Sequence, residues 1–164
     1  MNSIRSPVRC TLLFLCILVP GSLGAQHQLL EQRWIEITTD NFVLFSQVSS
    51  RQTQRFADQL ENWRRVTADI IGRSAPFPKA SVLNYVYVFE NAENFEYFTR
   101  ATEIAFFHRT PRSNFMALVL DDELSVRGAL HHYLHFLLRN YSDLRLPRWY
   151  EEGMAGYLSR MQIN

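Results

Sequence analysis

The sequence predicts one α+β domain in which a mixed β-sheet is followed by two adjacent helices. Short runs rich in β-branched and aromatic residues alternate with segments whose apolar residues recur at helical spacing. The last two helical segments follow one another with no strand between them, which separates this order from a regular βαβ alternation. A length of 164 residues with 47% hydrophobic residues is enough for one globular core and is unlike a disordered chain.

The domain is expected to begin with a β-hairpin and a long helix. The runs 34–38 and 42–45 are β-rich, and the short polar segment between them is typical of a turn. Ser49 then provides an N-cap and Gln52 its capping-box partner. Apolar residues at helical spacing follow, so the sequence predicts a helix over about 50–71.

A strand and a short helix are predicted next. The run 82–89 is the strongest strand signal in the chain, because β-branched and aromatic residues dominate it. Asn91 is placed to cap a short amphipathic helix that holds Phe95, Phe98 and Ile104. We expect the aromatic residues of this region to belong to the core.

The remaining part predicts one further strand and the two closing helices. The run 115–120 is apolar and ends at an acidic segment, after which Ser125 is expected to open a helix that extends to about residue 139. Pro147 precedes the last helix, over about 148–160, because proline is favoured where a helix begins.

The first 25 residues predict a secretory signal peptide, which leaves 26–164 as a single mature domain. Two arginines and no acid precede an apolar run over 12–19, and small residues then lead to Ala25. The apolar run is too short to span a bilayer, because a spanning helix needs about 20 residues. We therefore expect cleavage near Ala25, export to the periplasm or the extracellular space, and no stable membrane span afterwards.

The net charge and the cysteine positions exclude several partners and types of site for the mature domain. The chain has 17 Lys and Arg against 16 Asp and Glu, and removal of Arg5 and Arg9 leaves 15 against 16, a net charge of −1. Without clustered basic surface, nucleic acid is not an expected partner. Both cysteines, Cys10 and Cys16, lie in the predicted signal peptide, so the mature domain has no thiol for a disulfide or a metal. Any metal site must use histidines and carboxylates.

Three of the five histidines, His131, His132 and His135, fall within five residues of the predicted helix. Positions i and i+4 share one helix face, so His131 and His135 can contact one cation. The helix that follows Pro147 presents Glu152 one turn from its start. Two histidines and a carboxylate form the three-ligand set of a catalytic zinc site. From the residues alone, a polar seam between two helices that binds no metal stays an alternative.

These residues resemble the motif of a known family, the gluzincin metallopeptidases of the peptidase MA-like type, whose pattern is H-E-x-x-H followed by P-x-W-x-x-E-G-x-A. The match covers about residues 128–159. The resemblance implies a zincin-like domain in which His131, His135 and Glu152 bind Zn²⁺ and the partner is a peptide or protein. The matching residues are His131-x-x-x-His135 and Pro147-x-Trp149-x-x-Glu152-Gly153-x-Ala155.

The chain departs from the family motif at two positions. His132 stands where the family has its general-base Glu, and Gly156 stands where relatives commonly carry an acid four residues after the ligand Glu. Fuller relatives also continue with helical segments that close the cleft, whereas this sequence ends at Asn164. On this resemblance we expect a domain that lacks the C-terminal lobe.

Further expectations concern the surroundings of the site. Trp149 is expected to pack under it, and Gly153 to let the two helices approach closely. Glu151 points about 100° around the helix from Glu152, so we do not expect it to be a ligand. The strand 115–120 is expected to lie beside the cleft, where an edge strand can pair with an extended peptide.

Replacement of the general base leaves three hypotheses open. A positioned base contributes about 10²–10⁴ in rate, so its loss is severe, although neutral His132 can serve as a substitute catalytic base. The first hypothesis is an exported zinc hydrolase that uses His132 in this way. The second is a pseudopeptidase, with or without metal, that serves as a peptide or envelope-protein binding module. The third is a protein without a metal. We favour a retained zinc site with weak or absent peptidase activity.

Overall fold

The computed structural model describes residues 33–72, 75, 77–79, 82–99, 103–141 and 146–161. The predicted signal peptide, with both cysteines and the cleavage position, lies outside the described residues. No helix in the described ranges combines the length and the apolar character needed to cross a lipid bilayer.

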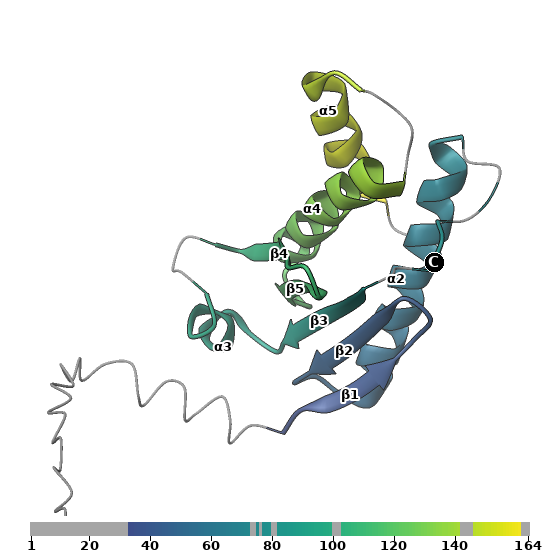
Figure 1. The fold of residues 1–164 in the computed structure, drawn as a ribbon. Coiled ribbons are helices and arrows are strands. Elements are labelled where there is room, and N and C mark those ends of the chain that lie inside the picture. Colours follow the sequence, from purple (N-terminus) through teal and green to yellow (C-terminus); the bar gives the residue numbers. More distant parts are fainter. Residues whose placement is uncertain are drawn as a thin grey trace, which may run out of the picture.

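The described strands form one mixed sheet in the order β1-β2-β3-β5-β4 (Figure 1). The three central strands, β2 (Phe42–Ser46), β3 (Leu83–Phe89) and β5 (Ser113–Val119), run parallel. The two edge strands, β1 (Ile35–Thr38) and β4 (Ala105–Arg109), are antiparallel to their neighbours. The N-terminal hairpin and the mixed sheet are therefore confirmed.

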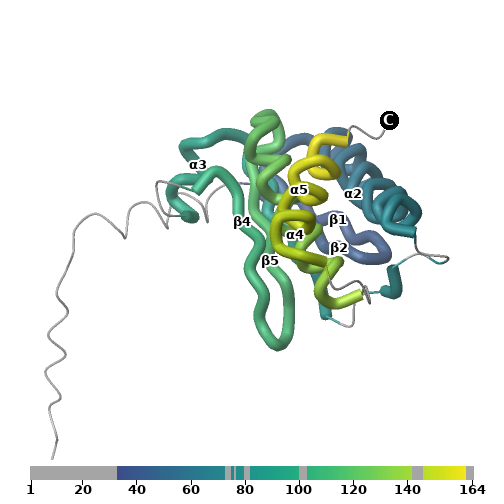
Figure 2. Tube along the Cα trace, turned by 90° about the horizontal axis from the view of Figure 1, so that it is seen from above, coloured from purple at the N-terminus to yellow at the C-terminus, as the bar shows by residue number. Residues whose placement is uncertain are grey.

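The helices confirm the predicted α+β class. The long helices α2 (Ser50–Ile70) and α4 (Glu123–Tyr141) pack on one face of the sheet, where the main core lies. The last helix, α5 (Arg148–Leu158), packs on α4, and α3 (Ala92–Glu96) lies against the ends of β3 and β5. Seen from above, α5 lies beside α4 and the β4–β5 hairpin extends beyond the helices (Figure 2).

The start of α4 differs from the expected one. The helix begins at Glu123, because a side-chain oxygen of Asp122 accepts hydrogen bonds from the N–H groups of Leu124 (2.9 Å) and Ser125 (3.3 Å) and so caps it. The expected helix opener Ser125 is instead fully buried. Its Oγ accepts a hydrogen bond from the Val119 N–H at 2.8 Å and donates one to the Ile104 carbonyl. This side chain therefore ties α4 to the end of β5 and to the segment before β4.

The sequence analysis missed β4, and two of its expectations for this region are wrong. The helix α3 ends at Glu96, so it contains neither Phe98 nor Ile104. In β4, Phe107 packs on the helix side of the sheet and Phe106 on the opposite side, so the alternation of polar and apolar residues that marks a strand is absent. The strand β5, predicted over 115–120, lies between β3 and β4, so neither of its edges is free to pair with an extended peptide.

The helix α4 is anchored to α2 and to the sheet through Tyr133, which is fully buried. Its ring contacts Phe42, Trp63 and Phe107 at centroid distances of 5.5, 6.0 and 5.5 Å. Its hydroxyl accepts a hydrogen bond of 2.9 Å from Nη1 of Arg64, whose other Nη atom donates to a backbone carbonyl. Burial raises the pKa of Tyr133, so the phenol stays neutral.

Replacing Ser125 with Ala is expected to lower the free energy of unfolding by about 1–3 kcal/mol, because it leaves the buried Val119 N–H without an acceptor. Urea denaturation followed by circular dichroism measures this change. The Ser50→Ala variant, in the exposed first turn of α2, is the control and should shift stability by less than about 0.5 kcal/mol. Equal stabilities of the two variants would contradict the assigned role of Ser125.

Candidate metal centre

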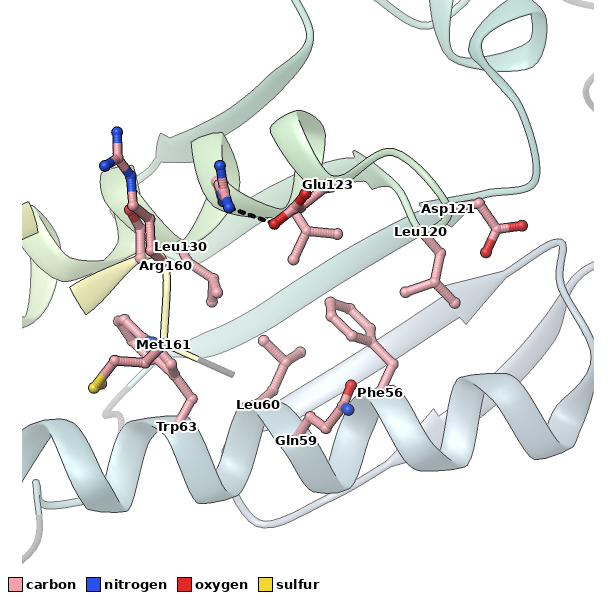
Figure 3. A pocket seen from close by; sticks show the side chains of 13 residues that line it. Phe56, Gln59, Leu60, Trp63, Leu120, Asp121, Glu123, Leu130, Arg160 and Met161 are labelled. Carbon is pink, nitrogen blue, oxygen red and sulfur yellow. Dashed lines mark hydrogen bonds and ion pairs between the residues drawn. The ribbon is translucent and has the colours of Figure 1, made fainter. Parts of the chain in front are cut away.

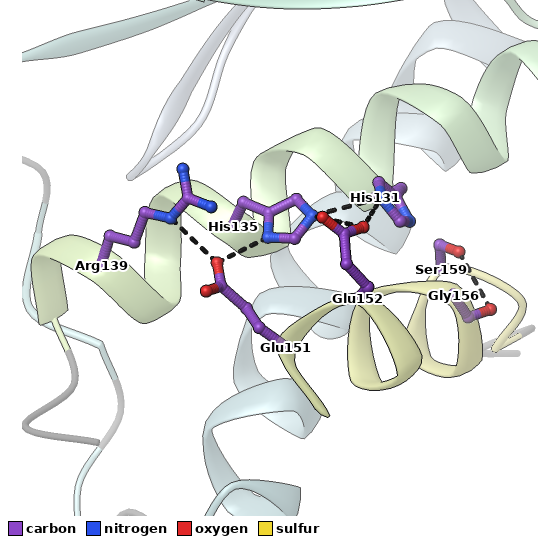
Figure 4. A network of polar contacts seen from close by, with 7 residues as sticks. All are labelled: His131, His135, Arg139, Glu151, Glu152, Gly156 and Ser159. Carbon is purple, nitrogen blue, oxygen red and sulfur yellow. Dashed lines mark hydrogen bonds and ion pairs between the residues drawn. The ribbon is translucent and has the colours of Figure 1, made fainter. Parts of the chain in front are cut away.

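Two packed helices bring the three expected ligands together. His131 and His135 lie one turn apart on α4, and Glu152 lies opposite them on α5 (Figure 4). The helix α5 keeps this position because Ala155 and Leu158 are buried on its inner side. The Leu158 carbonyl also accepts a hydrogen bond of 3.0 Å from the Trp63 ring N–H. The structure thus places the three residues as the sequence analysis expected.

The ligand atoms form a nearly equilateral triangle. Nε2 of His131 lies 3.2 Å from Nε2 of His135, and these two atoms lie 3.3 and 3.4 Å from Oε2 of Glu152. A tetrahedral zinc site with bonds of about 2.0–2.1 Å separates its ligand atoms by about 3.3–3.4 Å. The three residues therefore fit a zinc ion in both chemistry and spacing.

A second carboxylate, Glu151, holds one of the histidines. Its Oε1 lies 2.6 Å from Nδ1 of His135 and accepts a hydrogen bond of 2.9 Å from Nε of Arg139. A proton on Nδ1 of His135 is favoured by this contact, which leaves the Nε2 lone pair directed at the centre. Glu151 is not part of the ligand triangle, as expected, but its positioning role was missed. An acid directly before the ligand Glu152 was the available signal.

The pKa of the Glu151 carboxyl is lowered by its two partners. Partial burial raises the pKa of Glu151, but the hydrogen bond with His135 and the positive charge and hydrogen bond of Arg139 outweigh burial and lower it. Glu151 is consequently ionised at neutral pH, and a carboxylate in this position is a strong acceptor for the imidazole N–H.

The other ligand histidine has no comparable support. Within the described part of the chain, no hydrogen bond to Nδ1 of His131 is found. Gly156 occupies the position four residues after Glu152, and a Cβ added there meets no atom within 4 Å. The two histidines therefore differ, because a carboxylate contacts Nδ1 of His135 and, among the described residues, none contacts Nδ1 of His131.

The candidate substitute base, His132, is not part of the triangle. Its side chain is exposed, and its ring makes an edge-on contact with the ring of His131 at 5.5 Å. Partial burial lowers the pKa of His132, and the neighbouring His131 and His135 lower it further, although Glu152 opposes them. The imidazole of His132 is therefore mainly neutral at pH 7.

Two expectations for α5 are wrong. Trp149 does not pack under the site, because its side chain is 75% exposed and its ring contacts that of Tyr150 at 5.6 Å. Gly153 does not lie at the contact with α4, since it is exposed and a Cβ built there meets nothing within 4 Å. The fully buried Ala155 fills that contact instead.

A separate groove of about 420 Å³ lies between α2 and α4 (Figure 3). Apolar residues such as Phe56, Leu60 and Leu130 line it, and the Glu123–Arg127 ion pair lies at its rim. None of the three ligand residues lines this groove. It is therefore not part of the candidate metal site.

Comparisons with known protein families, with curated proteins and with solved structures find no match to this chain. The functional argument therefore rests on the residues themselves and on their geometry.

Replacing Glu151 with Gln is expected to weaken zinc binding about 10–100-fold, because an amide is a poorer acceptor for the Nδ1 proton of His135. Competition with a chromophoric chelator measures the affinity. Glu123→Gln removes an acid at the start of α4, away from the triangle, and should leave the affinity unchanged. If both variants bind zinc as tightly as the unaltered protein, Glu151 does not position a ligand.

Proposed function

We propose that this chain is an exported zinc-binding domain of the gluzincin metallopeptidase type, with weak or absent peptidase activity. The ion is held by His131, His135 and Glu152. The observation that carries the proposal is the convergence of their three ligand atoms at 3.2–3.4 Å, the spacing that tetrahedral zinc requires. Export rests on the composition of residues 1–25.

The chain's own residues provide the groups that a hydrolytic site needs to bind a zinc ion and to admit a peptide. When bound, zinc supplies a Lewis acid that polarises a carbonyl group and lowers the pKa of water towards about 7. Glu152 contributes a negative charge, and the Glu151–Arg139 pair fixes His135 in the required orientation. The side chains of His131 and Glu152 are partly exposed, so a peptide can reach the centre from solvent.

The proposed hydrolytic site lacks a carboxylate at the position of its general base. A positioned carboxylate base accounts for about 10²–10⁴ in rate, or about 3–5 kcal/mol. His132 stands at that position with a mainly neutral, exposed imidazole that can accept a proton but lies outside the ligand triangle. This arrangement favours a protein that binds zinc and peptide better than it hydrolyses peptide bonds.

A peptide-binding module without metal is the alternative. In that case an Nε2 proton can be donated either to the other histidine across 3.2 Å or to the carboxylate of Glu152 at 3.3–3.4 Å. Hydrogen bonds alone can hold α4 and α5 together at these residues, so the metal content of the protein distinguishes the two proposals.

The purified protein, equilibrated with zinc and desalted without chelators, is expected to retain about one zinc ion per chain. The His131→Ala variant should lose it, because two ligands bind zinc far more weakly than three. His108→Ala, on the exposed part of β4, should retain it. Inductively coupled plasma mass spectrometry measures the content. Absence of zinc from the unaltered protein would overturn the proposed zinc site.

The His132→Glu variant is expected to hydrolyse members of a peptide library about 10²–10⁴-fold faster than the unaltered protein, because it restores a carboxylate base. His132→Gln has similar size without a basic carboxylate and should show no gain. Combining His132→Glu with His131→Ala should abolish the activity. If the unaltered protein already matches His132→Glu, then His132 is itself an efficient base and weak activity is the wrong conclusion.

A further inference from the structure

The helix α5 carries apolar side chains on both of its faces. Ala155 and Leu158 are buried on the inner face, which packs on α4. The outer face carries Trp149, Tyr150 and Tyr157, which are 75%, 45% and 73% exposed. Clustered exposed aromatic rings mark an interaction surface.

We propose that this outer face binds a second copy of the chain, through antiparallel packing of two α5 helices. Trp149, Gly153 and Tyr157 follow one another at four-residue intervals, so they lie along one line of the helix. The pattern is large, small, large, and it is symmetric about Gly153. A two-fold axis at Gly153 brings each Trp149 beside the second copy's Tyr157, which is the self-complementarity that an isologous interface needs.

The backbone at the centre of this line is accessible. A Cβ built on Gly153 or on Gly156 meets no atom within 4 Å, so both positions face open space. The distance between packed helices depends on the side chains at their contact. With glycine at the centre, two copies of α5 can approach closely while the aromatic rings on either side fill the flanking space.

The aromatic area accounts for much of a small interface. With about 150–250 Å² for each aromatic side chain, the exposed fractions of Trp149, Tyr150 and Tyr157 give roughly 300–480 Å² per copy. The pair of copies then buries roughly 600–960 Å² from these rings alone. A specific interface begins at about 1,000–1,200 Å² in total, so the residues around these rings must supply the remaining roughly 40–600 Å².

Glu152 is directed at α4 and away from this surface. The inferred dimer is therefore independent of zinc and leaves the ligand triangle open.

Analytical ultracentrifugation of the purified protein over about 1–200 μM tests the dimer. A reversible monomer–dimer equilibrium is expected, and Trp149→Asp should raise its dissociation constant by about 30-fold or more, as for a central aromatic anchor. Leu124→Asp is the matched control, because Leu124 is 60% exposed on α4 and should leave the equilibrium unchanged.

Gly153→Leu is a second variant that does not depend on losing an aromatic residue. A Cβ at this position meets no atom of its own chain within 4 Å, and leucine favours helix more than glycine does. The thermal stability of the monomer should therefore be kept or raised while association is lost. A monomer at all concentrations, or a dimer that neither Trp149→Asp nor Gly153→Leu weakens, would overturn the proposal. Zinc content serves as an independent readout and should be the same in every variant.

Discussion

The hydrogen bond from the Arg64 guanidinium to the Tyr133 hydroxyl holds the helix that carries the two histidines of the proposed metal site. Arg64 is only 3% exposed, and a buried cation is tolerated when its N–H groups have partners and aromatic rings surround it. The rings of Phe77 and Tyr141 lie 5.3 and 5.7 Å from this guanidinium. Because Tyr133 lies between His131 and His135 in sequence, fixing its side chain fixes the rotation of α4 about its axis. The opposite side of the helix is thereby directed at α5.

The helix α2 controls the second half of the site as well. Trp63, adjacent to Arg64, donates its ring N–H to the carbonyl of Leu158 at the end of α5. One helix far from the histidines in sequence therefore anchors both α4 and α5. The convergence of the ligand atoms depends on these two contacts. Disturbing α2 is expected to separate the ligands even where their own side chains are intact.

Much of the fold could be predicted from local patterns, and so could the convergence of the three candidate ligands. The hairpin, α2 and the closing helices have clear periodicity or caps, and the i, i+4 spacing of His131 and His135 defines one face without tertiary information. What sequence reasoning missed depends on partners distant in the chain. The strand β4 is apolar on both faces because helices cover one side and Phe98 packs on the other. The exposed position of Trp149 likewise depends on how α5 packs on α4, and the local sequence pattern does not predict that packing.

The unequal support of the two histidines has a kinetic consequence. His135 is pre-oriented by Glu151 and Arg139, whereas Nδ1 of His131 has no hydrogen-bond partner among the described residues, and Gly156 leaves open space where an acid could stand. An imidazole without an outer hydrogen-bond partner has less to hold its ring in the ligating orientation. In the proposed zinc site, release of the ion should therefore begin at His131, while His135 and Glu152 would still hold it. Such a site would exchange zinc with its surroundings more readily than one in which both histidines are supported.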